Sequence, residues 1–302
     1  MTRRYASTGT ALVAFEKRLK EEPLGERTRT FYRETVHAVL RIMEEEGLPT
    51  NPSYVTPQHL QELLECFSRR NLTVATRKGY LSALKKFYKS CNCSAFDHIR
   101  VRLPSDIRPN VDWYTPTEAK ALLELDKSPL QTIVIHCELC LGMRRVEIIR
   151  LRPEDIHDPE RYLDVRGKGP GGGKLRSIPY ASNTREIMQL ALDRRAEQIA
   201  ARTAGEIPGN LILWLKAGRL HAYSEEGYGL DKVVTEPLSK QLGFRVTNHK
   251  GRRTFGRSLY RAGVPVPTIS KLLGHENPEV TLKYIGVDLD DMRLAMEIQL
   301  YA

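Results

Sequence analysis

The chain has 302 residues, a formal net charge of +10 and a pI near 9.4, and 41% of its residues are hydrophobic. This length and apolar content suffice for two domains with their own cores, which excludes a disordered basic tail. The positive excess indicates a polyanionic partner, nucleic acid before an anionic membrane. The apolar run at residues 11–15 is too short for a signal-peptide core or a membrane span. We therefore expect a cytosolic (cytoplasmic) protein that has no membrane partner.

The five cysteines are too few, and odd in number, for a disulfide framework. Cys91-x-Cys93 and Cys137-x-x-Cys140 could together supply four thiolates to zinc. However, residues 133–141 have the pattern of an apolar helix, which would bury the second pair as small hydrophobic side chains. We favour buried free thiols, and we expect no metal and no cofactor.

Four amphipathic helices are predicted in the first 90 residues. They cover residues near 8–20, residues 26–46, a segment opening at Thr56-Pro57, and residues 73–90. Apolar side chains recur at helical spacing in them, including Val74, Leu81, Leu84 and Tyr88 of the last. We expect these helices to form a small all-helical domain.

The helix predicted at residues 73–90 carries five cations and no acidic residue. Ion pairs within the helix therefore cannot account for its charge. A lysine-rich face can serve solubility alone, but we favour contacts with nucleic-acid phosphates. The predicted nucleic-acid contacts are Arg77, Lys78, Lys85, Lys86 and Lys89.

A change of pattern marks a domain boundary near residue 112. Residues 94–112 mix basic residues with Pro104 and Pro109 and keep no helical period. Thr115-Pro116-Thr117-Glu118 then has the form of a capping box, which opens a new helix. The predicted domains are residues 1–107 and 113–302, joined by a linker at 108–112.

The second domain is predicted to be mostly helical, with one β-hairpin. Residues 161–166 and 175–180 have strand character and are joined by the glycine-rich segment 167–174. That segment lacks the Gly-Lys-Ser/Thr ending of a P-loop and joins two strands, so a nucleotide site is not favoured. Residues 204–245 are predicted to be irregular and receive no function. The fold class is mainly α with a small antiparallel β element.

Six residues of the second domain combine the side chains that phosphodiester cleavage needs. Arginine forks pair with phosphate oxygens, a lysine on a loop can act as a general acid, and a tyrosine can attack phosphorus. No single one of these residues indicates phosphodiester cleavage by itself. Their joint order in one domain, behind a basic helical domain, does indicate it. They are Arg144, Lys168, His249, Arg252, His275 and Tyr284.

This order resembles the tyrosine recombinase (phage integrase) family. Three segments carry the match: Gly-x-Arg-x-x-Glu at 142–147, His-x-x-Arg at 249–252, and Leu-Leu-Gly-His at 272–275, with Tyr284 nine residues on. The resemblance implies a four-helix SAM-like core-binding domain followed by a catalytic domain. With the first predicted helix near residue 8, it implies the simpler Xer-like or Cre-like architecture.

The resemblance also implies a role for each residue. Tyr284 would attack the scissile phosphate, giving a 3′-phosphotyrosine and a free 5′-hydroxyl. The other roles are stabilisation of the transition state by Arg144, Arg252 and His275, protonation of the 5′-oxygen by Lys168, assistance by His249, and support of Arg144 by Glu147. Lys174 on the same loop is the alternative to Lys168, and Arg253 stands where many relatives have a second histidine.

The implied partner is double-stranded DNA with a specific target site. The resemblance also implies a homotetramer that joins two DNA duplexes at the nucleoid, with accessory proteins. Integration, excision and dimer resolution, including those of mobile elements, stay open as programmes. A last helix is predicted from Asp288, with Leu289, Met292, Met296 and Leu300 along one side, packing on its own domain or on a neighbour. The alternatives are a type IB topoisomerase and a DNA-binding regulator that has lost catalysis.

Overall fold

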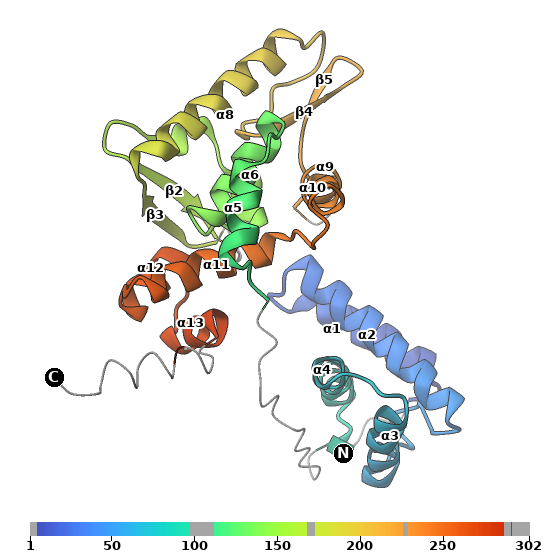
Figure 1. The fold of residues 1–302 in the computed structure, drawn as a ribbon. Coiled ribbons are helices and arrows are strands. Elements are labelled where there is room, and N and C mark those ends of the chain that lie inside the picture. The colour runs from blue at the N-terminus through green and yellow to red at the C-terminus, as the bar shows by residue number, and fades with distance from the viewer. Residues whose placement is uncertain (1–4, 97–111, 168–172, 226–228, 287–290, 292–302) are drawn as a thin grey trace, which may run out of the picture. The chain divides into compact units, whose positions relative to one another are not determined.

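The computed structural model describes residues 5–96, 112–167, 173–225, 229–286 and 291. The chain divides into two compact units, Met1–Arg108 and Pro109–Ala302 (Figure 1). Helices dominate both units, and every strand of the described residues lies in the second. The predicted mainly α-helical fold with a small antiparallel β element is confirmed. None of the described helices has both the length and the apolar character needed to cross a membrane.

The first unit contains the four predicted helices. They are α1 (Thr8–Glu21), α2 (Glu26–Glu45), α3 (Pro57–Arg69) and α4 (Val74–Ser90), followed by a 3-10 turn at Ser94–Phe96. Hydroxyl caps begin three of them: the side chains of Ser7, Thr56 and Thr73 accept from backbone N–H groups of the first turn. The helices share one apolar core.

Helix α4 buries a face that differs in part from the prediction. Ala83, Leu84, Phe87 and Tyr88 are buried, whereas Val74 and Leu81 are only half-buried. The reason is that α4 packs against both α1 and α2, so a wider face is covered than a single apolar row. The ring of Phe87 meets that of Phe15 edge-on, with centroids 5.3 Å apart.

The cations of α4 fall into two groups. Lys86 forms an ion pair with Glu22, and Arg77 donates from Nε to the Leu72 carbonyl at 2.8 Å. As predicted, no acidic residue of α4 itself pairs with these cations, and the partner of Lys86 comes from the segment after α1. The other three, hereafter the three exposed lysines, lie within about 40° of one another around the helix, from its 3.6-residue period. They are Lys78, Lys85 and Lys89.

The second unit is built around α6 (Pro129–Leu139), which packs against α5 (Pro116–Glu124), α7 (Arg145–Arg150) and α8 (Ser182–Ala200). The predicted capping box opens α5: Thr115 Oγ1 accepts from the Glu118 N–H, and Glu118 Oε2 accepts from the Thr115 N–H. Residues of α6 are buried almost all round, as a central helix requires.

Two small antiparallel sheets lie in the second unit. The first has the order β1 (Ile156–His157), β2 (Tyr162–Arg166), β3 (Leu175–Pro179), and β2 and β3 are the two predicted strands. The second is the hairpin of β4 (Leu213–Lys216) and β5 (Arg219–Ala222).

The prediction that residues 204–245 are irregular is wrong. Besides the hairpin β4–β5, they contain α9 (Gly229–Val233) and α10 (Thr235–Leu242). The strands have only four residues each, too few for alternation to be visible in sequence. Pairing across the hairpin stabilises them, including a Trp214–His221 ring stack at 4.7 Å.

Three helices complete the described part of the second unit. They are α11 (Asn248–Arg261), α12 (Val266–Leu273) and α13 (Pro278–Ile285), and α13 packs on both others. Ile269, Leu273 and Ile285 form their common core. The helix predicted from Asp288, with Leu289, Met292, Met296 and Leu300, lies outside the described residues, although Asp291 is placed and pairs with Arg257 of α11.

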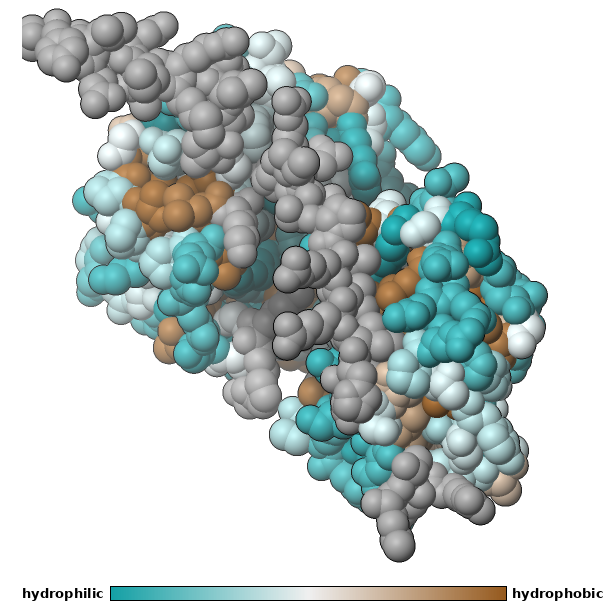
Figure 2. Space-filling view, turned by 90° about the horizontal axis from the view of Figure 1, so that it is seen from below, coloured by the Kyte–Doolittle hydropathy of each residue, from teal (hydrophilic) through white to brown (hydrophobic). Residues whose placement is uncertain are grey.

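Polar side chains cover much of the face in Figure 2, with separate apolar areas between them.

Candidate active site

Glu147 is the centre of the candidate site. It is completely buried, on α7, and its Oε2 accepts from the Arg144 N–H at 2.7 Å. Arg176, on β3, donates to both carboxylate oxygens at 2.8 and 2.9 Å. Burial by itself raises the pKa of this carboxyl, but the bonds and charge of Arg176, with the charge of Arg252, lower it to about 2. Glu147 is therefore ionised and lies against the guanidinium groups of Arg144, Arg176 and Arg252. The sequence predicted only that it supports Arg144.

Arg252 is held rigidly in the interior. It is 1% exposed, and it donates to the carbonyls of Gly142 and Leu273 and, at 3.3 Å, to Nε2 of His275. Glu147 Oε2 lies 3.6 Å from its Nη1. Burial, followed by the charge of Arg144, lowers the pKa of Arg252 to about 10, so it stays charged at neutral pH.

Arg144 is the N-cap residue of α7 and is half-buried. Its Nη1 donates to Glu147 Oε1 at 2.8 Å. No partner for Nε or Nη2 is found among the residues that the structure describes. These N–H groups are the ones that could bind an incoming anion.

His275 follows α12 and has a partner at each ring nitrogen. Nδ1 lies 2.8 Å from the Thr281 hydroxyl, and Nε2 accepts from Arg252. Because Nε2 accepts, the proton of the neutral ring lies on Nδ1. Burial lowers the pKa of His275 to about 4, and the charges of Arg252 and Arg144 act in the same direction. The imidazole is therefore neutral at pH 7 in the absence of an anion.

Tyr284 lies on α13 against the same cluster. Its ring meets that of His275 edge-on at 5.3 Å, and the guanidinium carbons of Arg252 and Arg253 lie 5.9 and 5.4 Å from its centroid. The hydroxyl is buried and has no hydrogen-bond partner of good geometry among the described residues. Burial raises the pKa of Tyr284, and the arginines, Arg252 first, oppose this rise.

Two glycines of the matched segments are required by close packing. Gly142 has φ +59°, and a Cβ there would lie 2.3 Å from Cδ1 of Phe255. Gly274 has φ +63°, and a Cβ there would lie 2.9 Å from Cδ of Arg176. A side chain at position 142 would displace the Phe255 ring, and one at position 274 would displace Arg176.

The structure thus brings Arg144, Arg252, His275 and Tyr284 together around Glu147. His249 lies in the first turn of α11, one turn before Arg252, with an exposed side chain. The remaining predicted residue, Lys168, lies outside the described residues. Its alternative Lys174 is exposed and pairs with Glu276, the residue after His275, at 2.5 Å.

Arg176 and Thr281 belong to the site and are missing from the sequence prediction. Arg176 follows Lys174 by two residues, and its place on β3 points it toward Glu147, 29 residues earlier. Thr281 is completely buried. An arginine in a short strand and a threonine in a helix carry no signal by themselves, because both types are common on surfaces.

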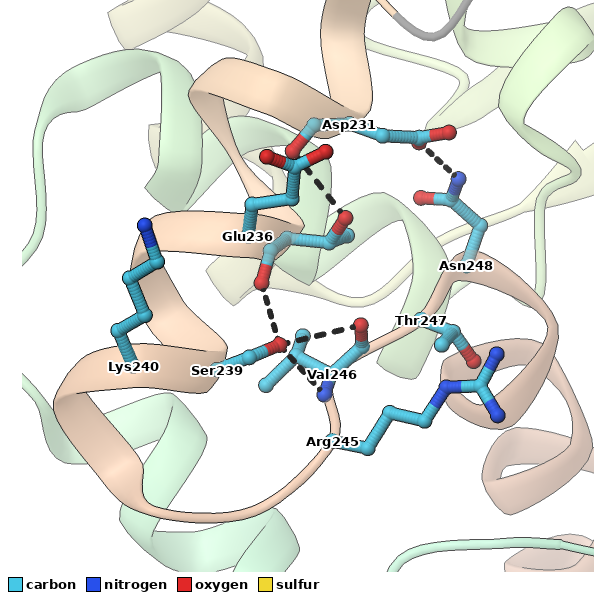
Figure 3. A pocket seen from close by; sticks show the side chains of 9 residues that line it. Asp231, Glu236, Ser239, Lys240, Arg245, Val246, Thr247 and Asn248 are labelled. Carbon is cyan, nitrogen blue, oxygen red and sulfur yellow. Dashed lines mark hydrogen bonds between the residues drawn. The ribbon is translucent and has the colours of Figure 1, made fainter.

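A pocket of about 400 Å³ lies beside the start of α11, and none of the clustered site residues lines it. Asp231, Glu236, Lys240 and Arg245 give its lining charges of both signs. Figure 3 shows Asp231 facing Asn248, which donates to it at 2.6 Å. We assign the pocket no catalytic part.

All five cysteines are free thiols, and Cys140 alone of them is half-buried. It caps the end of α6, which ends at Leu139 rather than at the predicted residue 141. Among the described residues, no group of three or more His, Cys, Asp or Glu side chains could hold a metal ion.

Comparison with family models matches most of the chain. Residues 112–290 match the phage integrase family, and residues 12–91 match the phage integrase N-terminal SAM-like domain. Tyrosine recombinase XerC of Bacillus pumilus is 25% identical, with 87% of this chain and 86% of that protein covered. Tyrosine recombinase XerA of Pyrococcus furiosus is 25% identical, with 90% and 96% covered.

Solved structures share the fold. The XerH site-specific recombinase bound to palindromic difH substrate superposes with a TM-score of 0.67 at 18% identity, over 98% of this chain and 86% of that one. The family matches and the relatives define a tyrosine-type site-specific DNA recombinase. The chain belongs to the tyrosine recombinase (phage integrase) family, as its sequence motifs predict.

Proposed function

We propose that this protein cuts and rejoins double-stranded DNA at a specific site through a covalent bond between Tyr284 and a 3′-phosphate. The observation that carries the proposal is the placement of Tyr284: its buried hydroxyl has no hydrogen-bond partner of good geometry among the described residues, and its ring lies against Arg252 and His275. A phosphodiester that entered this cluster would meet both the nucleophile and the positive charge that its transition state needs.

The chemistry needs no external energy source. The Tyr284 oxygen forms a bond to phosphorus, the bond to the 5′-oxygen breaks, and the phenolic proton leaves as another proton reaches that 5′-oxygen. The new phosphodiester retains the bond energy, so attack by a 5′-hydroxyl reseals the strand. Because burial raises the pKa of Tyr284, a base or the phosphate must take its proton during attack.

Arg144 and Arg252 neutralise the non-bridging oxygens in this proposal. Arg252 is fixed by backbone carbonyls, so little order is lost when the phosphate binds. The anion would also offset the charges that lower the pKa of His275, so that a protonated imidazole can donate to the phosphate. His249 would assist from the preceding turn of α11.

The leaving oxygen takes its proton from a lysine of the β2–β3 loop. We propose Lys168, on the family spacing. Lys174 is the alternative: its pairing with Glu276 holds it beside His275.

We propose residues 1–107 as the core-binding domain, 108–112 as the linker and 113–302 as the catalytic domain, with the three exposed lysines contacting DNA phosphates. Four protomers on two duplexes, with accessory proteins, would complete the exchange at the nucleoid. Solved relatives support the DNA partner, among them a Tn1549 transposon integrase in complex with transposon right end DNA.

The test traps the covalent intermediate. The protein is incubated without metal or ATP with fragmented candidate genomic DNA that carries nicks, denatured in SDS, and the attached DNA is sequenced. A nick near the cleavage site lets the short 5′-hydroxyl strand leave, so the adduct accumulates. We expect attached DNA that shares one site.

Two tyrosine variants decide the result. Tyr284→Phe should abolish the adduct, whereas Tyr260→Phe, on α11 in the same apolar cluster, should keep it. An adduct that survives Tyr284→Phe contradicts the assigned nucleophile. Tight DNA binding without any adduct supports the regulator, and relaxation without exchange between two DNAs supports the topoisomerase.

A further inference from the structure

We infer that Arg176 is a positioning residue for DNA cleavage: it joins strand β3 to Glu147 and to the turn before His275, and so sets His275 against Arg252 and Tyr284. The inference rests on the proposed function, because it assigns a part in the same reaction.

Arg176 contacts three separate pieces of the site. Both its Nη atoms donate to Glu147 at 2.8 and 2.9 Å, and its Nε donates to the Leu272 carbonyl at 3.1 Å. Its Cδ, Nε and Nη1 lie beside Gly274, so close that a Cβ there would not fit. The guanidinium therefore fixes the backbone of the two residues that flank Leu273, just before His275.

The same contacts keep Arg252 in place against His275. Glu147 has two oxygens, and Arg176 occupies both with short bonds, whereas Arg252 stays 3.6 Å from the carboxylate. Without Arg176, Glu147 would have only Arg144 and Arg252 to neutralise it in the interior. Arg252 would then move toward Glu147 and away from the carbonyls of Gly142 and Leu273. Its Nη2 would also lose its contact with Nε2 of His275.

Lysine cannot replace Arg176 in this position. A single ammonium cannot pair in plane with two carboxylate oxygens while it also reaches the Leu272 carbonyl. The side chain of Arg176 is only 13% exposed, so it is a built part of the interior rather than a surface cation. Its bonds go to Glu147 and the Leu272 carbonyl and not to Tyr284, whereas the guanidinium carbon of Arg252 lies 5.9 Å from the centroid of the Tyr284 ring.

The experiment measures the single-turnover rate of adduct formation on a nicked DNA that the wild type cleaves. The variants are Arg176→Lys and Arg176→Ala, with Arg166→Lys as a matched control. Arg166 lies on the adjacent strand β2 and pairs with the buried Asp155 at 2.7 Å, away from the cluster. We expect a loss of about 100-fold for Arg176→Lys, the order that a misplacement of 1 Å can cost, and more for Arg176→Ala. The control should stay within about 3-fold, with unchanged DNA affinity in all three.

A double-mutant cycle with His275→Ala separates positioning from a general loss of structure. If Arg176 acts through His275, Arg176→Lys should cost less than about 3-fold further in the His275→Ala background. The full loss in both backgrounds, or no loss in either, overturns the inference. If the wild type forms no adduct, the proposed function is wrong and this inference falls with it. If the wild type forms the adduct and the Arg176 variants behave as the control does, only this inference is wrong.

Discussion

Replacing Glu138 with methionine should stabilise the second unit, because this carboxyl is buried without a hydrogen bond. Glu138 lies on α6, is 1% exposed, and neither oxygen has a partner among the described residues. Helix α11 passes close by: a Cβ on Gly251 would lie 3.0 Å from Cβ of Glu138. Burial, followed by the charge of Asp231, raises the pKa of Glu138 well above its usual 4.5, and Arg145 opposes this only in part.

The sign and size of the effect follow from this burial. A buried polar group without a partner lowers the free energy of unfolding by about 1–3 kcal/mol. Methionine has a similar length and no such group, so it should remove this cost while adding a packing cost below ~1.5 kcal/mol. The folded state also binds the carboxyl proton more tightly than the unfolded state does. The free energy of unfolding should therefore fall as the pH rises from 4.5 towards the folded-state pKa of Glu138.

Urea unfolding measures both the stability gained in Glu138→Met and the pH dependence caused by the Glu138 carboxyl. Trp113 and Trp214 are the only tryptophans of the chain and both lie in the second unit, so their fluorescence reports on it. Glu138→Gln removes only the titration and should flatten the pH dependence above pH 4.5. Glu138→Met should flatten it equally and also raise the midpoint at every pH.

Two results would refute the reasoning. The first is a Glu138→Met protein that is less stable than the wild type at pH 8. The second is a wild type whose pH dependence matches that of Glu138→Gln. Either would mean that the carboxylate is ionised and stabilised in the folded protein.

Three further predictions concern other groups. Burial lowers the pKa of His136 to about 4, so the unfolded state binds more protons below pH 6.5, and up to ~3 kcal/mol of stability should be lost between pH 6.5 and 4. This contribution should be absent from His136→Gln, so the urea midpoint of the variant should fall less than that of the wild type over this pH range; equal falls would contradict the assignment. Thr281→Val removes the partner of His275 Nδ1 and should slow adduct formation about 10-fold at unchanged DNA affinity; an unchanged rate would contradict the assigned orientation. Replacing the three exposed lysines by glutamine should reduce the slope of log affinity against log salt by about 3 in a binding titration, and an unchanged slope would exclude them as phosphate contacts.

The sequence by itself determined the four helices of the first unit, the start of α5 and the family. Hydroxyl caps such as Thr115 and the 3.6-residue apolar period are local signals, readable without knowledge of distant contacts. The segments around Arg144, Arg252 and His275 were recognised by their resemblance to the motifs of the tyrosine recombinase family. In the structure, the glycine at 274 meets a packing requirement, because a Cβ there would lie 2.9 Å from Cδ of Arg176.

Only the tertiary structure decided what joins these segments. Arg176 reaches Glu147 across 29 residues, and Arg252 reaches the Gly142 carbonyl across 110. The buried state of Glu138, on which its pKa and its cost depend, is likewise set by α11 and not by its own helix. Such contacts leave no periodic trace, because they arise where separate elements meet, and their energies come from the desolvation that only the folded chain imposes.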